Sequence, residues 1–192
     1  MKYIFKGEKG YFKSRKTKLG IGSLTGFFLM VVTYFIGYLI FGTGKNLVTI
    51  IAVLIVLPTV KIFVQYLMIP WYKKRPEDEF SSLQTICAPL KLYTELLITA
   101  SEKNFEIIYL LIDRNDNIIA YTEKSAKNTE LFEKGVTNFL NYYNFDSKVK
   151  LFTDLKQFEK RAKQLAASNA ELSEDNLEHI NLVFEKLSIM SI

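Results

Sequence analysis

The chain has 192 residues, with one cysteine, one histidine and a formal net charge of +5. The single cysteine excludes an internal disulfide, and one cysteine with one histidine cannot build a structural zinc site. Residues 1–75 hold 12 Lys/Arg and one acidic residue, whereas residues 76–192 hold 13 Lys/Arg and 19 Asp/Glu. The two parts carry +11 and −6, which sum to +5. Because the positive charge lies beside apolar segments, it indicates contact with anionic lipid headgroups, and nucleic acid is not an expected partner.

Two long apolar runs follow the basic N-terminus. The run 19–44 has no charged residue, and the run 46–72 has one, Lys61. Each is long enough to cross a bilayer, which takes about 20 helical residues. The first run is too long for the apolar core of a cleaved signal peptide, about 15 residues at most, and offers no small-residue cleavage site. The short turn 42–46 returns the second run beside the first, so residues 19–72 are predicted to form a two-helix transmembrane hairpin.

Basic residues flank the two predicted spans on one side. Short flanking segments rich in Lys and Arg stay in the cytoplasm, whereas the turn between the spans holds only Lys45. The sequence therefore predicts a multi-pass protein of the cell membrane with both termini cytoplasmic and its basic residues at the anionic inner leaflet. The residues that set this orientation are Lys13, Arg15, Lys16, Lys18, Lys73, Lys74 and Arg75.

The division of the chain follows from these spans. Residues 1–18 are expected to be a basic cytoplasmic leader, 19–72 the hairpin, 73–80 a linker, and 81–192 a soluble α/β or α+β domain. We also expect residues from about Pro76 onward to fold without the hairpin, because the pattern of caps and apolar faces there is self-consistent.

Lys61 and Gln65 are the polar residues of interest in the second span. They are four residues apart and share one helix face, and Pro58 is expected to kink the helix just before them. An ionisable residue inside a span indicates a functional site by default. A lysine in the cytoplasmic third of a span can also extend its ammonium to the membrane surface, and this interpretation is favoured because neither span offers an acidic partner.

Gly22 and Gly26 form a small-xxx-small pattern in the first span. This pattern lets two helices approach closely. Packing against the second helix of the hairpin and homo-oligomerisation through the hairpin explain it equally well.

The soluble domain is expected to begin with a helix. Ser81 and Gln84 form a capping box, and apolar residues of 82–101 recur on one helical face, with Pro89 kinking or splitting the helix. A β-hairpin follows, with an apolar strand over 105–112, a turn over 113–117 and a second strand over 118–123.

The remaining elements alternate between helix and strand. A helix is expected over 129–143, a short strand over 149–153, a helix capped by Asp154 and a last helix capped by Ser173. The helical crossover between the second and third strands allows these strands to be parallel. These elements predict a three-stranded mixed sheet covered by helices.

No motif assigns a catalytic, cofactor or metal role to any residue. Asp113, Asn115 and Asn117 occupy the first, third and fifth positions of a calcium loop, but Ile118 stands where that loop requires glycine, so we expect a turn. His179 lies off the core face of its helix and is interpreted as an unpartnered surface residue. Cys87 lies among apolar residues and is expected to be packed and inert.

The element order is similar to that of restriction-endonuclease-type nucleases, which place carboxylates and a Glu-x-Lys around a metal. Glu95, Asp113 and the pair Glu123 and Lys124 lie roughly where such groups would be expected. However, Glu123 and Lys124 are adjacent, and on a strand they would face opposite sides. The similarity concerns element order alone.

Three classes of function remain open. The favoured class is a membrane-anchored binding or regulatory module whose acidic soluble domain docks a protein partner with a basic surface. The second is an accessory subunit of a membrane or transport complex that acts through the hairpin. The third is a membrane-associated hydrolase or nuclease-like enzyme.

Overall fold

A computed structural model of the chain describes residues 4–70, 76–123, 128–169 and 171–191. The chain divides into two compact units, one of residues 12–72 and one that combines residues 1–11 with 73–192. We call them the hairpin unit and the α/β unit. Lys73, Lys74 and Arg75, three of the residues predicted to set the orientation, lie outside the described residues.

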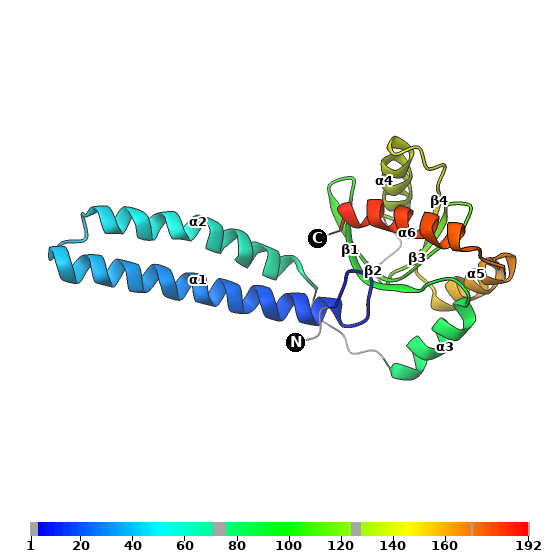
Figure 1. Ribbon diagram of the computed structural model, residues 1–192, viewed down its shortest axis with the longest axis horizontal. Helices are drawn as coiled ribbons and strands as arrows, with labels where there is room; N and C mark the ends of the chain where they lie inside the picture. The colour runs from blue at the N-terminus through cyan, green and yellow to red at the C-terminus, as the bar shows by residue number, and fades with distance from the viewer. Residues whose placement is uncertain (1–3, 71–75, 124–127, 170, 192) are drawn as a thin grey trace. The chain divides into compact units, whose positions relative to one another are not determined.

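Two apolar helices make up the hairpin unit: α1 (Tyr11–Phe41) and α2 (Leu47–Met68). Both have the length and hydropathy that a bilayer crossing requires. Asn46 closes the turn between them, because its Oδ1 accepts a hydrogen bond from Thr49 N at 2.9 Å and its Nδ2 donates to Thr43 O at 2.7 Å. The predicted pair of antiparallel helices is therefore present, and Figure 1 shows them side by side.

Glycines of α1 bring the two helices together. A Cβ added at Gly26 would lie 2.4 Å from Thr59 Oγ1, and one added at Gly22 would lie 3.6 Å from a methyl group of Ile62. Gly26 thus permits a backbone approach that no larger residue allows at this place. Packing within the hairpin uses both members of the small-xxx-small pattern.

The α/β unit contains a four-stranded sheet: β1 (Tyr93–Ala100), β2 (Lys103–Ile112), β3 (Asn117–Tyr121) and β4 (Lys148–Phe152). The strands lie in the order β1-β2-β3-β4. β1 pairs antiparallel with β2, β2 antiparallel with β3, and β3 parallel with β4. The predicted hairpin and the predicted parallel third strand are confirmed.

The sequence prediction of three strands is wrong, because residues 93–100 form β1 and not the second half of a helix. The first helix of this unit, α3 (Glu77–Cys87), ends just before Pro89. β1 is almost wholly buried along its length, so its apolar residues show no alternation, and a short apolar run of this kind fits either a helix or a strand. The β-branched residues Thr94, Ile98 and Thr99 were the available signal for a strand.

Helices cover both faces of the sheet. α4 (Thr129–Tyr142) and α6 (Glu174–Ile189) contact each other and form one layer, and α3 and α5 (Leu155–Ser168) form the other (Figure 1). The predicted caps at Asp154 and Ser173 are present, since Asp154 accepts from Lys156 N and Ser173 accepts from Asn176 N. The predicted capping box at Ser81 is wrong, because α3 begins four residues earlier, at Glu77, and the Ser81 hydroxyl donates to Glu77 O within the helix. The core between the layers is closely packed around the fully buried side chains of Phe132, Phe158, Ile107, Leu110 and Ile118.

Candidate functional site

The first part of the predicted leader, up to Tyr11, belongs to the α/β unit, and we keep the name leader for this part. Thr94 N of β1 donates a hydrogen bond to Gly7 O at 2.8 Å, and the two residues form an antiparallel bridge. Lys6 Nζ donates to Ser191 O at 2.7 Å and to Ser188 O at 3.3 Å. The leader, expected only to flank the membrane, therefore also covers the outer edge of the sheet.

Gly7 fits against two stacked rings. Tyr93 of β1 and Phe184 of α6 stack with their centroids 3.8 Å apart. A Cβ added at Gly7 would lie 2.7 Å from Phe184 Cζ and 3.0 Å from Tyr93 Cδ1, and the φ of Gly7 is +84°. Both the space and the backbone conformation require glycine here.

Two further contacts hold the end of the leader. Gly10 N donates to Glu95 Oε1 at 2.8 Å, and Glu95 has a φ of +54° within β1. Lys9 Nζ lies 2.6 Å from Glu77 Oε1 and 4.8 Å from the ring centroid of Phe80. A non-glycine residue with positive φ in a strand is strained, and here the strain accompanies the contact to Gly10.

The C-terminal part of the chain covers the rest of the same edge. Ser191 forms an antiparallel bridge with Ile98, and Thr99 N donates to Met190 O at 2.9 Å. The β1 edge is thus closed by backbone from both ends of the chain, and Lys6 joins the two covering segments.

At the opposite edge of the sheet, formed by β4, a side chain binds the backbone of the strand. Glu133 of α4 accepts a hydrogen bond from Leu151 N of β4 at 3.0 Å. Lys150 Nζ lies 3.2 Å from the same carboxylate oxygen. The outward N–H of Leu151 on this edge strand is therefore satisfied by a carboxylate from the adjoining helix.

The two helical layers present different surfaces. The large apolar side chains that the layers expose belong to α4 and α6: Leu131, Tyr142, Leu177, Leu182 and Ile189. On α6, the exposed residues Glu178, Leu182, Glu185 and Ile189 recur at helical spacing and share one face. We call these four residues the α6 stripe. It is an amphipathic, acidic surface.

The outer face of α5 has the opposite charge. Its exposed residues include Lys156, Lys160, Arg161 and Lys163. The net negative charge of this part of the chain is therefore unevenly spread: α6 exposes carboxylates and α5 exposes cations, while the first turn of α3, in the same layer as α5, holds Glu77, Asp78 and Glu79.

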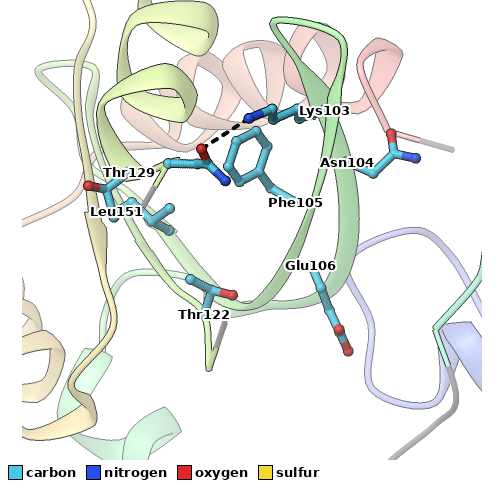
Figure 2. Close-up of a pocket in the computed structure, with 8 residues that line it drawn as sticks. Lys103, Asn104, Phe105, Glu106, Thr122, Thr129 and Leu151 are labelled. Atoms are coloured by element: carbon cyan, nitrogen blue, oxygen red, sulfur yellow. Dashed lines mark hydrogen bonds between the residues drawn. The ribbon is translucent and has the colours of Figure 1, made fainter. Parts of the chain in front are cut away.

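A cavity of about 290 Å³ opens where β2 begins and α4 begins. In Figure 2, Lys103 and Phe105 lie on its inner side, whereas Asn104 and Glu106 point away from them, as alternate residues of a strand do. Lys103 Nζ donates to Asn128 Oδ1 at 3.1 Å. The residues that line the cavity are Lys103, Asn104, Phe105, Glu106, Thr122, Asn128, Thr129 and Leu151.

The carboxylates compared with a nuclease site are not brought together around this cavity. Asp113 Oδ1 accepts from Asn115 N and Asn117 N, both at 2.8 Å, and its Oδ2 accepts from Asn117 Nδ2 at 2.7 Å, which is the role of a turn residue. Glu95 binds Gly10, and Lys124 lies outside the described residues. Within the described ranges, no three His, Cys, Asp or Glu side chains are grouped to hold a metal ion.

His179 has a partner that the sequence did not suggest. Its Nε2 lies 2.7 Å from Asp116 Oδ1, and its ring packs edge-on against Phe145 with centroids 5.8 Å apart. The prediction of an unpartnered surface histidine is wrong. Asp116 lies in the β2–β3 turn, 63 positions away in the sequence, and no local pattern links the two residues.

Cys87 lies at the end of α3 and is completely buried. Burial, together with the nearby carboxylate of Glu159, raises the pKa of its thiol to about 12. Because the thiolate is the reactive form, this cysteine is packed and inert, as the sequence indicated.

In the hairpin unit, the predicted polar residues are arranged as follows. Lys61 is exposed on α2, and the backbone carbonyl of Gln65 accepts from Ile69 N at 3.3 Å. Lys16 Nζ donates to Ile69 O at 2.9 Å and lies over the ring of Tyr66. Lys16 thus binds the C-terminal end of α2, while Lys13 and Lys18 are exposed.

An apolar groove of about 310 Å³ runs between α1 and α2. It lies toward the turn, beside the close approach of Gly37 to Val48. Its lining residues are Met30, Val31, Tyr34, Phe35, Thr49, Ala52, Val53 and Val56.

Comparisons with protein families, with curated proteins and with solved structures gave no match for this chain. The function is therefore argued from the residues themselves.

Proposed function

We propose that the chain is a membrane-anchored binding or regulatory module whose α/β unit lies in the cytoplasm and docks a protein partner. The observation that carries this proposal is the combination of two span-length apolar helices with an α/β unit that presents an amphipathic acidic surface. Three arguments support it: the sidedness of the chain, the charge beside the spans, and the nature of the exposed surface.

The leader supports placing the N-terminus and the α/β unit on the same side. Gly7 and Thr94 are joined by a backbone hydrogen bond, although the hairpin separates them in sequence. Two segments that form one sheet edge cannot lie on opposite sides of a bilayer. This argument does not depend on charge.

The charge around the spans favours the cytoplasmic side. Lys13, Arg15, Lys16 and Lys18 precede the first span, and Lys45 alone lies in the turn. Such an excess of Lys and Arg is retained in the cytoplasm.

The α6 stripe supports a protein partner. Leu182 and Ile189 are 43% and 60% exposed, and Glu178 and Glu185 lie beside them on the same face. An apolar centre flanked by carboxylates fits a partner with apolar and basic side chains.

Sidedness is tested by labelling single cysteines on intact cells with an impermeant thiol reagent, in a Cys87→Ala background. We expect Thr43→Cys, in the turn, to be labelled, and Lys163→Cys, on exposed α5, to be labelled only after permeabilisation. Labelling of Lys163→Cys on intact cells would place the α/β unit outside.

The partner surface is tested with a matched pair of charge reversals in the full-length protein. Glu178→Lys with Glu185→Lys reverses the charge of the α6 stripe. Lys156→Glu with Lys163→Glu makes a change of charge on α5 that has the same size and the opposite sign. Proteins that copurify in mild detergent are then quantified by mass spectrometry. We expect a specific partner to be lost with the α6 pair and kept with the α5 pair. If both pairs keep every partner, the α6 stripe is not the docking surface.

The second candidate function, an accessory subunit acting through the hairpin, is favoured by the apolar groove and by the exposed Lys61. Both would face another transmembrane helix as readily as lipid. This function predicts that Lys61→Leu abolishes copurification, whereas the α6 charge reversal does not.

A further inference from the structure

The leader is joined to the hairpin without a loop. Gly10, whose N–H is held by Glu95, is followed directly by Tyr11, the first residue of α1. A helix transmits displacement along its axis because its backbone hydrogen bonds keep it rigid. Any movement of the first turn of α1 relative to the sheet therefore acts on Gly10 and on the segment before it.

Separable hydrogen bonds help to hold this segment on β1, beside the packing of Gly7 against Tyr93 and Phe184. These bonds include the one from Thr94 N to Gly7 O, the one from Gly10 N to Glu95, and those of Lys6 to the carbonyls of Ser188 and Ser191. In addition, Glu95 stands in a left-handed conformation within the strand. Release of Gly10 removes the bond that accompanies this strain, and relief of the strain would offset part of the cost of release.

We propose that residues 4–10 form a latch, a displaceable segment that closes the outer edge of β1 and couples the α/β unit to the hairpin. A shift of α1 draws the latch away from Thr94 and opens half of the β1 edge. The other half, at Thr99, is covered by Met190 and Ser191 and stays closed. The inference rests on the proposed membrane setting.

Opening the latch changes the surface that β1 presents. Thr94 N–H loses its acceptor, and the stacked rings of Tyr93 and Phe184 lose the backbone of Gly7 that covers them. An unpaired strand edge beside exposed aromatic rings accepts an extended peptide segment. The latch thus acts as an autoinhibitory contact whose state depends on the position of α1.

The first test measures amide exchange in the full-length protein in lipid nanodiscs, with resolution of single residues. Thr94 reports on the latch, and Thr99, five residues along the same edge, is the control within the molecule. Glu95→Gln weakens the bond to Gly10, and we expect exchange at Thr94 to rise about tenfold or more with Thr99 unchanged. An equal rise at both amides, or no rise at Thr94, would overturn the proposal.

The second test measures coupling to the membrane. Nanodiscs of short-chain and long-chain lipids displace spanning helices through hydrophobic mismatch. We expect exchange at Thr94 to differ between the two lipids in the wild-type chain, and the difference to vanish when Gly-Ser-Gly-Ser is inserted between Tyr11 and Phe12. Identical Thr94 exchange in both lipids would refute the coupling. A failure of the membrane assignment looks different, because the protein would then not enter nanodiscs at all.

Discussion

The two edges of the sheet are closed by different means. At β4, one carboxylate, Glu133, meets Leu151 N from a helix only 18 positions earlier in the sequence. At β1, backbone segments from opposite ends of the chain meet the strand, and the bonds of Lys6 join residues 182 and 185 positions apart. Local closure forms with little loss of chain entropy, whereas distant closure depends on everything between its two ends.

The difference matters because unpaired strand edges pair with other chains. The β4 edge keeps its cover whatever happens to the hairpin. The β1 edge keeps half of its cover only while the leader is present and correctly placed. We therefore expect disturbances of the two edges to differ in size and in kind.

Removal of the leader should have the largest effect. We compare the fragment 76–192 with a shortened chain in which a brief Gly/Ser linker replaces residues 12–75. The linker can be brief because Lys9 Nζ and Glu77 Oε1 are 2.6 Å apart. We expect the fragment without the leader to be less stable by about 2–4 kcal/mol, from lost hydrogen bonds and apolar burial, and to self-associate. Urea unfolding measures the difference in stability, and light scattering measures the self-association.

Equal stability of the two shortened proteins, with both monomeric, would show that the leader does not contribute to the domain. The expectation that residues from about Pro76 onward fold without the hairpin would then hold for the fragment 76–192 alone.

Gly7 gives the next largest effect. In the linked shortened chain, Gly7→Ala forces a Cβ against Phe184 and also carries the cost of a positive φ, so we expect a loss of about 1–3 kcal/mol. Gly10→Ala is the matched control, because its φ is +87° but the nearest atom to its Cβ is 3.7 Å away. The difference between the free energies of unfolding of the two variants, measured in urea, isolates the contribution of the close approach of Gly7 to Phe184. Similar losses for both would mean that only the backbone conformation matters.

Glu133 should have a smaller effect at the β4 edge. Glu133→Ala leaves Leu151 N without its acceptor, at a cost of about 1–2 kcal/mol, while Glu133→Gln keeps an acceptor and costs less. Thermal unfolding of the linked shortened chain measures both. Lys150→Met tests the exposed ion pair separately, and its loss should stay below about 0.5 kcal/mol. A loss at Glu133 larger than that at Gly7 would reverse the ranking of the two edges.

Titration of Cys87 has the smallest effect at neutral pH and grows only in alkali, and the burial of its thiol makes it a probe of domain opening. Its folded pKa of about 12 exceeds the unfolded value of about 8.5, so the unfolded state loses its proton first as pH rises. Stability from this group is complete below about pH 8.5 and declines toward pH 12. Cys87→Ala should flatten that decline, as pH-dependent unfolding would show. At pH 8, an aromatic disulfide reagent should react with Cys87 faster after leader removal than after Glu133→Gln.

How far the sequence predicted the fold depends on how local each signal is. The β2–β3 hairpin, β4 and the caps at Asp154 and Ser173 were predicted because their signals lie within a few residues. β1 was missed because Pro89 was interpreted as kinking or splitting a helix that continues beyond it, whereas α3 ends before this proline. The strand is buried on both faces and shows no alternation to correct that interpretation.

The candidate sites were less predictable than the fold. The contact of Gly7 with Thr94 and the pairing of His179 with Asp116 join residues that the chain brings together only after folding. Gly7 lies among basic residues, and the sequence analysis explained the charge of these residues by contact with anionic lipid headgroups. A short leader with two glycines, Gly7 and Gly10, was the available signal, since glycine is the residue that positive φ and close backbone approach require.

The hairpin interrupts the sequence of the α/β unit, and this placement sets an order of events during synthesis. Gly7 leaves the ribosome before the hairpin, and β1 follows only after both apolar helices have been made. Met190 and Ser191, which cover the remaining half of the edge, come last of the described elements. Synthesis of the hairpin therefore precedes completion of the sheet edge, and the part of the β1 edge at Thr99 stays open until the end of α6 has emerged from the ribosome.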